Sequence, residues 1–179
     1  MNGRPFVVVV TGSECTGKTT LTREIARHAS APWSPEFVRE YLDRKGMELD
    51  ATDVEPIAIG QIAVEDAALS DASALLVKDT DLVSTVVYAR HYYGACPAWI
   101  EEAALARRGD LYLLLHPDVP WVADGLQRDR PVERDLLHGL FRSALAGFGA
   151  RVVDVTGTWE ERRDRAFEAV RAACGPVPR

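Results

Sequence analysis

The residues best suited to chemistry lie in one short loop near the amino terminus. Residues 12–19 read Gly-Ser-Glu-Cys-Thr-Gly-Lys-Thr and fit the pattern G-x-x-x-x-G-K-[ST] of a phosphate-binding P-loop. In such a loop the glycines permit a tight turn, and backbone N–H groups and the start of the next helix face the phosphates. Lys18 is expected to reach the β- and γ-phosphates, and the Thr19 hydroxyl to bind Mg²⁺. The residues expected to bind a nucleoside triphosphate are Gly12, Ser13, Glu14, Cys15, Thr16, Gly17, Lys18, Thr19 and Thr20.

Two acidic residues follow the next buried segment of the chain. Asp79 comes soon after the apolar run 74–77, and Asp81 lies two residues further on. The carboxyl end of a strand in a parallel sheet faces the crevice in which ligands bind. We therefore expect Asp79 to bind Mg²⁺, directly or through water, or to accept the proton of an attacking hydroxyl group. Asp81 is as well suited to cap the following helix as to contact a ligand.

Arginine is concentrated in a proline-interrupted segment, residues 117–134, which contains Arg128, Arg130 and Arg134. Phosphoryl transfer is accelerated by guanidinium groups that close over the transferring phosphate. A polar segment between regular elements is also typical of a mobile lid. We expect an Arg-rich lid here, although a solvated charged loop would explain any single one of these arginines equally well.

Aromatic residues are frequent near the polar loops. Flat rings can enclose a heteroaromatic substrate, and a cationic ring gains most from them. Core packing is the expected role of most of them, and Trp121 is the least core-like. None of the four histidines is expected to have a partner at the spacing of a catalytic triad or metal site, and Asp154 is expected to be structural. The aromatic residues in question are Trp33, Tyr41, Tyr88, Tyr92, Tyr93, Trp99 and Trp121.

The elements that must position these residues alternate between strand and helix patterns. This alternation predicts an α/β protein with the three-layer P-loop NTPase fold, a five-stranded, mainly parallel sheet with helices on both faces, in a single domain spanning residues 1–179. A capping box with Thr52 as N-cap and Glu55 three residues later is expected to open one helix. Strands are expected at 6–10, 36–38, 74–77, 111–115 and 152–155. Helices are expected at 20–27, 52–70, 82–93, 98–107, 136–148 and 159–173.

Composition excludes several classes of protein. Apolar residues make up 47% of the 179 residues, enough for a full core, and the net charge of −6 argues against a protein that wraps nucleic acid. No apolar stretch approaches the ~20 residues of a membrane helix, and no secretory signal is recognisable. We therefore expect a cytoplasmic protein that acts on a small molecule, either as a monomer or as a homo-oligomer.

Five segments taken together resemble the ribosylnicotinamide kinase domain of bacterial NadR. The Asp-Thr-Asp triplet and the Pro-Trp-Val-Ala-Asp-Gly-Leu run are much more specific than the P-loop, and the resemblance covers nearly the whole chain. The family tends to have Arg after this run, where the chain has Gln127 followed by Arg128. Either the lid is shifted by one residue or the acceptor differs. The matching segments are 12–21, 36–41, 79–81, 110–114 and 120–126.

The resemblance implies ATP-dependent phosphorylation of the 5′-hydroxyl of nicotinamide riboside, with Mg²⁺, to give nicotinamide mononucleotide. The larger members also carry an adenylyltransferase and a DNA-binding domain, for which this chain has no room, so we expect a stand-alone kinase. Thr19 and Asp79 would hold Mg²⁺, and Asp79 or Glu40 would accept the hydroxyl proton. The residues expected to be catalytic are Lys18, Glu40, Asp79, Arg128 and Arg130. Those expected to bind the acceptor are Arg39, Glu40, Asp81, Tyr88, Tyr92, Trp121 and Asp124.

Two other functions fit parts of the sequence. A kinase of a deoxynucleoside or nucleoside monophosphate would share the fold, so the fold alone does not separate it from a riboside kinase. The density of Trp and Tyr favours the cationic nicotinamide ring. A regulatory ATPase without an acceptor would show ATP turnover that is independent of added nucleosides. A GTPase would need a guanine-reading N-K-x-D after a strand, which the chain lacks.

Overall fold

A five-stranded parallel sheet forms the centre of the molecule. The structure, a computed structural model, describes residues 4–120 and 133–174. The strand order is β2-β3-β1-β4-β5, and each neighbouring pair is parallel, which confirms the predicted α/β P-loop NTPase fold. The strands are β1 (Phe6–Thr11), β2 (Trp33–Ser34), β3 (Leu75–Asp79), β4 (Leu111–Leu115) and β5 (Val152–Val155).

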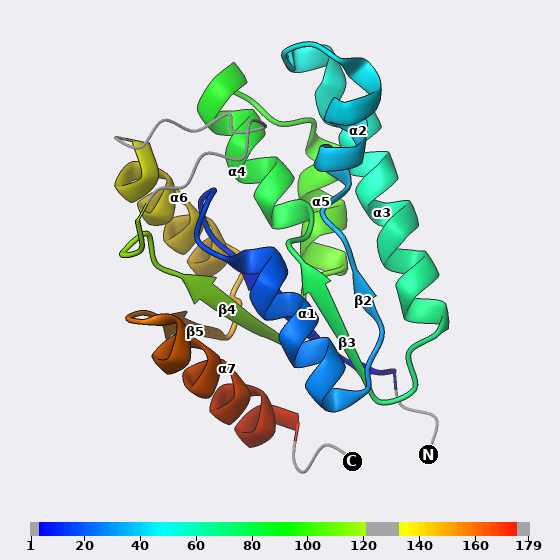
Figure 1. Cartoon of the computed structure of the whole chain (residues 1–179). Helices are drawn as coiled ribbons and strands as arrows, with labels where there is room; N and C mark the ends of the chain where they lie inside the picture. The colour runs from blue at the N-terminus through cyan, green and yellow to red at the C-terminus, as the bar shows by residue number, and fades with distance from the viewer. Residues whose placement is uncertain (1–3, 121–132, 175–179) are drawn as a thin grey trace.

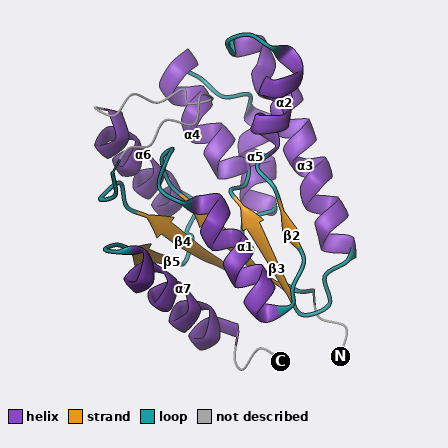
Figure 2. Ribbon diagram, in the orientation of Figure 1, coloured by secondary structure: helices purple, strands orange, loops and turns teal. Residues whose placement is uncertain are grey.

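Helices cover both faces of the sheet and give the three layers expected (Figures 1 and 2). Helices α1 and α7 pack on one face, and α3, α4, α5 and α6 pack on the other, while α2 lies beyond the carboxyl ends of the strands. The helices are α1 (Lys18–Ala29), α2 (Phe37–Lys45), α3 (Val54–Ser70), α4 (Leu82–Tyr93), α5 (Ala98–Ala106), α6 (Arg134–Gly147) and α7 (Trp159–Cys174), and a short 3-10 helix spans Ala51–Asp53.

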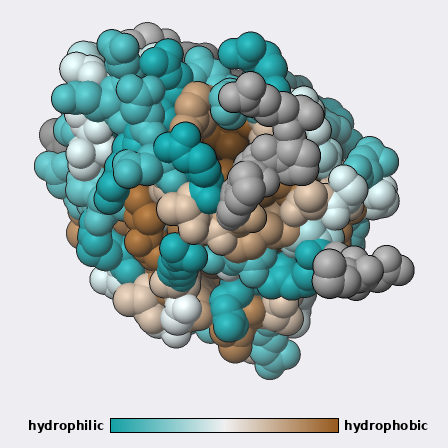
Figure 3. Space-filling model, turned by 90° about the horizontal axis from the view of Figure 1, so that it is seen from below, coloured by the Kyte–Doolittle hydropathy of each residue, from teal (hydrophilic) through white to brown (hydrophobic). Residues whose placement is uncertain are grey.

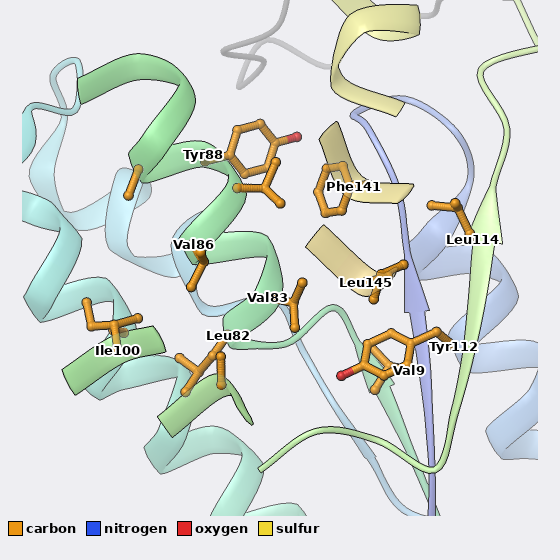
Figure 4. Close-up of a cluster of buried hydrophobic side chains, with 14 of the residues drawn as sticks. Val9, Leu82, Val83, Val86, Tyr88, Ile100, Tyr112, Leu114, Phe141 and Leu145 are labelled. Atoms are coloured by element: carbon orange, nitrogen blue, oxygen red, sulfur yellow. The ribbon is translucent and has the colours of Figure 1, made fainter. Parts of the chain in front are cut away.

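The valine run of β1 is buried on both faces because the sheet lies between two helical layers. Val8 and Val10 pack with α1 and α7, whereas Val7 and Val9 pack with the helices of the other face. Figure 4 shows the second cluster, in which Phe141 of α6 lies near Tyr88 of α4. Apolar β-branched residues on consecutive positions suit a strand that is covered on both sides.

Two local predictions were wrong. The second strand is Trp33–Ser34 and not 36–38, because Pro35 cannot donate a backbone hydrogen bond to continue the ladder. Phe37 instead begins α2, and its N–H donates to the side chain of Gln61 at 2.9 Å.

The capping box lies two residues before the predicted one. Asp50 accepts from the Thr52 N–H at 2.8 Å, and Asp53 accepts from the Asp50 N–H at 2.7 Å. Asp53 also accepts from the Tyr41 hydroxyl of α2 at 2.7 Å, while Glu55 accepts from the Trp99 indole at 3.0 Å. Contacts between distant segments therefore decide which of two similar patterns forms the cap.

The carboxyl ends of the strands meet at one end of the molecule, above the sheet in Figure 1, and both chain termini lie at the other end. The loop after β1, the Asp79–Asp81 turn after β3 and His116 after β4 are therefore neighbours in space. Figure 3 shows the opposite end, where apolar residues appear as patches between hydrophilic ones. Among the described helices, none is long and apolar enough to cross a membrane.

Candidate active site

The loop between β1 and α1 has the backbone shape that its two glycines were expected to permit. Gly12 has φ +135°, and a Cβ there would lie 2.7 Å from the Leu115 carbonyl oxygen. Gly17, the N-cap of α1, has φ +89°, and a Cβ there would lie 2.8 Å from the Trp159 ring. Both conformations are costly for residues with a side chain. The loop thus requires glycine at both positions for two independent reasons.

Lys18 is held over this loop and is nearly buried. Its ammonium donates to the Ser13 carbonyl at 2.9 Å, and the Thr16 hydroxyl donates to the same oxygen at 2.9 Å. The Lys18 ammonium therefore lies against the backbone of the loop, next to the amino end of α1. A phosphate group bound there would meet a cation and a helix amino terminus together.

Thr19 and Asp79 come together as predicted for a magnesium site. The Thr19 hydroxyl donates to Asp79 Oδ2 at 2.6 Å, and Asp79 is 1% exposed. The second carboxylate oxygen, Oδ1, is buried and has no hydrogen-bond partner among the described residues. Hydroxyl and carboxylate oxygens are the ligands that Mg²⁺ prefers, so this pair fits the cation that the P-loop pattern implies.

The environment of Asp79 opposes its ionisation. Burial and the nearby Glu36 raise the pKa of Asp79 to about 6, against the effects of Thr19, Lys18 and Arg39. A divalent cation would reverse this balance by favouring the ionised carboxylate. The ionised form of Asp79 is therefore unfavourable without a ligand, and a bound cation would stabilise it.

Glu36 is the acidic residue that sequence reasoning missed. It lies just after the short strand β2, its side chain is 10% exposed, and it accepts from Arg39 Nε at 3.1 Å. Glu40, predicted to be catalytic, is 61% exposed and pairs with Arg44 at 3.3 Å on the surface of α2. Glu36, and not Glu40, raises the pKa of Asp79, and the catalytic role expected for Glu40 stays a prediction. No signal in the sequence indicated this, because the adjacency of β2 to β3 is visible only in the fold.

A cleft between α2, α3 and α4 opens beside Glu36 and Thr80. Its water-accessible volume is about 30 Å³, room for only a few water molecules, so a larger ligand would have to widen it. Tyr88 and Tyr93 line it, and Tyr92 stacks on Tyr88 at 6.0 Å between ring centroids; the acceptor contacts expected of Tyr88 and Tyr92 stay predictions. Among the described residues that line it, the only two charged ones, Glu36 and Asp50, are acidic. The polar residues that line it are Glu36, Asp50, Gln61, Thr80, Ser84, Thr85, Tyr88 and Tyr93.

Asp81 lies inside the protein and not in this cleft. One carboxylate oxygen accepts from the Val83 N–H at 3.0 Å, and the other accepts from the Tyr112 hydroxyl at 2.5 Å. Burial, followed by the effect of Glu65, raises the pKa of Asp81 to about 6. The expected contact with the acceptor is therefore corrected, and Asp81 is the N-cap of α4.

Two buried arginines hold the P-loop from outside. Arg134, the first residue of α6, donates to the Cys15 carbonyl at 3.4 Å and to the Val119 carbonyl at 2.9 Å. Arg162 of α7 is 0% exposed and donates to the Thr16 carbonyl at 3.2 Å. Arg162 was not anticipated, because nothing in its local sequence distinguishes it from the other arginines of α7. The predicted lid residues Trp121, Asp124, Arg128 and Arg130 lie outside the described residues.

The prediction that no histidine has a suitable partner was wrong. His116 Nε2 lies 2.8 Å from Asp154 Oδ1, and the ring centroids of His116 and His138 are 4.1 Å apart. These residues lie 38 and 22 positions apart in the chain, so no local spacing pattern reveals them. Asp154 thus belongs to a cluster of titratable side chains.

Known proteins resemble the chain over most of its length. NadR of Salmonella typhimurium, named as a trifunctional NAD biosynthesis and regulator protein, is 32% identical over 131 residues, and its Escherichia coli counterpart is 31% identical over 131 residues. Each match covers 69% of this chain but only 32% of the relative, so the chain corresponds to about one third of those proteins.

Solved structures give the same result. The crystal structure of NadR protein in complex with NR aligns with a TM-score of 0.86 and 29% identity, covering 98% of this chain and 54% of that one. NadR in complex with NAD and AMP-PNP aligns with a TM-score of 0.79 and 28% identity, covering 98% and 51%. Thymidylate kinase from Ehrlichia chaffeensis, at 13% identity and a TM-score of 0.66, shares the fold.

A family model supplies the broadest assignment. The model described as AAA domain matches residues 7–162, from the start of β1 to the first turn of α7. Because this match includes the P-loop, Asp79 and four of the five strands completely, the chain belongs to the AAA domain family.

Proposed function

We propose that this chain is an ATP-dependent kinase that phosphorylates the 5′-hydroxyl of nicotinamide riboside to give nicotinamide mononucleotide. The observation that carries the proposal is an acidic cleft, lined by Glu36 and Asp50, that opens beside Thr80, the residue after Asp79. The similarity to NadR in complex with NR supports the same acceptor. The chain matches only part of NadR, so the proposal concerns this kinase step alone.

The donor phosphates are held by cations and N–H groups around the loop. Lys18 and the amino end of α1 bind the β- and γ-phosphates, and Arg134 adds a buried positive charge at Cys15. Thr19 and Asp79 hold Mg²⁺, which supplies positive charge for the transferring phosphate. Arg128 and Arg130 remain candidates for contact with the γ-phosphate. The P-loop thus positions the donor and stabilises the negative charge that develops.

The acceptor hydroxyl enters between Asp79 and the cleft. Asp79 is already bonded to Thr19, so Glu36 is the carboxylate better placed to accept the hydroxyl proton. Its ion pair with Arg39 fixes the direction of the Glu36 carboxylate. Arg39 is thereby a positioning residue, and its predicted contact with the ribose stays a prediction.

The negative charge of the cleft favours a cationic acceptor. The nicotinamide ring of the riboside is cationic, and the cleft is lined by the acidic side chains of Glu36 and Asp50 and by Tyr88 and Tyr93. A nucleoside monophosphate brings two negative charges to the same lining and would be repelled. This contrast favours the riboside over the competing acceptors that share the fold.

An acceptor panel tests the proposal. We expect ATP, Mg²⁺ and nicotinamide riboside to give a phosphorylated product by mass, with one ADP per product, and nucleoside monophosphates to give little. Nicotinic acid riboside, which has the same shape but a carboxylate, should be a poorer acceptor. Lys18→Ala should abolish transfer. Faster turnover of a monophosphate would favour the alternative kinase, and ATP turnover without an acceptor would favour a regulatory ATPase.

A further inference from the structure

Three side chains that the proposed kinase chemistry does not use meet at one edge of the sheet. His116 follows β4, Asp154 belongs to β5, and His138 lies on α6. His116 Nε2 lies 2.8 Å from Asp154 Oδ1, and one ligand atom from each of the three residues lies within 4.8 Å of the others. Two imidazoles and one carboxylate thus converge on a single point.

Regular elements hold the three residues in place. Leu114 of β4 pairs with Asp154 of β5, and the His116 N–H donates to the Val155 carbonyl at 3.0 Å. Helix α6 is fixed over these strands by Phe141 and its neighbours in the core, as Figure 4 shows. A site built on strands and a packed helix needs little rearrangement to bind a ligand.

The chemistry of the three groups fits a transition-metal cation. Imidazole nitrogen and carboxylate oxygen bind Zn²⁺, Co²⁺ and Ni²⁺ at about 2.0–2.2 Å, which places tetrahedral ligand atoms about 3.4 Å apart. The three ligand atoms, now within 4.8 Å of one another, would therefore move together on binding. A neutral ring is the form that binds metal.

We propose that His116, His138 and Asp154 bind one transition-metal cation of the zinc, cobalt or nickel class. The site is separate from the magnesium site of Thr19 and Asp79, which offers oxygen ligands alone. Three protein ligands leave one position of a tetrahedral cation for water.

Arg142 competes with this cation. Its guanidinium forms an ion pair with Asp154 and lies 3.4 Å from His116 Nε2. The Arg142 side chain is 49% exposed, so it can turn into solvent when a cation takes its place beside Asp154. The carboxylate is then neutralised by the metal in place of the guanidinium, and removal of Arg142 should strengthen metal binding.

Metal binding at this site would also affect the P-loop through Arg162. The His116 carbonyl accepts from Arg162 at 2.9 Å, and the same guanidinium donates to Thr16 of the loop. A cation bound to His116, Asp154 and His138 would link β4, β5 and α6. It would do so next to Arg162, which hydrogen-bonds both the His116 carbonyl and the phosphate-binding loop. Metal binding should raise the melting temperature of the protein.

Cobalt titration of the untagged protein tests the proposal. The visible absorption of Co²⁺ is followed at pH 7.5 with excess Mg²⁺, and Zn²⁺ is then added as competitor. We expect one equivalent to bind with nitrogen ligands and to be displaced by Zn²⁺. His138→Gln and Asp154→Asn should each weaken binding by about tenfold or more. His28→Gln, an exposed histidine elsewhere, is the matched control.

Arg142→Gln separates a metal site from a structural ion-pair cluster. Loss of one positive charge beside the cation should tighten binding by about tenfold, whereas a structural role predicts no such gain. Circular dichroism checks that each variant is folded. The proposal is overturned by no saturable binding below about 100 μM Co²⁺, by binding that His138→Gln and Asp154→Asn leave unchanged, or by binding that only Asp79→Asn removes.

Discussion

Replacing Asp79 by Asn should stabilise the protein in the absence of ligand while abolishing its activity. The buried carboxyl has a pKa of about 6 in place of its ordinary 3.8, which by linkage corresponds to about 3 kcal/mol of destabilisation at pH 7. This value is an upper limit for Asp79 alone, because part of the pKa increase comes from the repulsion between the Asp79 and Glu36 carboxylates. Asn keeps the size of the side chain and an oxygen that accepts from Thr19. We therefore expect a gain of about 1–3 kcal/mol in the free energy of unfolding.

The pH dependence of the gain follows from the direction of the pKa change. The folded state binds the Asp79 proton more tightly than the unfolded state, so wild-type stability falls as pH rises from about 4 to about 6. Asn does not titrate. The stability difference between variant and wild type should therefore be smallest near pH 4, increase up to about pH 6 and then stay constant. Urea unfolding at pH 4, 5, 6 and 7.5 measures it.

Ligand addition should reverse the order of stability. Mg·ATP, which we propose to bind through Thr19 and Asp79, should raise the melting temperature of the wild type more than that of the variant. Asp71→Asn, at an exposed position after α3, is the control and should change stability by less than about 0.5 kcal/mol. A variant that is less stable at pH 7.5, or a difference that does not vary with pH, would refute the electrostatic reasoning.

Three further predictions concern the loop and the proposed base. Glu36→Gln should lower kcat by about 10²–10⁴-fold in the acceptor assay, while the exposed Glu40→Gln changes it less than twofold; equal effects would contradict the assignment. Gly17→Ala should cost about 1–2 kcal/mol in urea unfolding and raise the KM for ATP, because φ is +89° and Trp159 is close; unchanged stability would contradict this. Arg162→Ala should cost about 2–4 kcal/mol and weaken ATP binding measured by calorimetry, whereas the exposed Arg165→Ala should not.

Local patterns determined the framework of the molecule. The bounds 82–93, 111–115 and 152–155 were predicted as the structure has them, since each segment carries its own apolar period between clear turn signals. The P-loop was equally evident, because its glycines and Lys18 are adjacent in the chain. Phosphate binding is the one part of the site that a continuous segment can specify.

Tertiary structure decided which distant groups meet. Glu36 became the proposed base because the parallel neighbours β2 and β3 bring their carboxyl ends together, although Pro35 shortens β2 to two residues. The contact of Arg162 with Thr16 spans 146 residues. The cluster of His116, His138 and Asp154 joins two strands and a helix. A local pattern records whether a segment is buried or exposed, but the partner of a buried charge depends on the order of strands, and that order exists only in the fold.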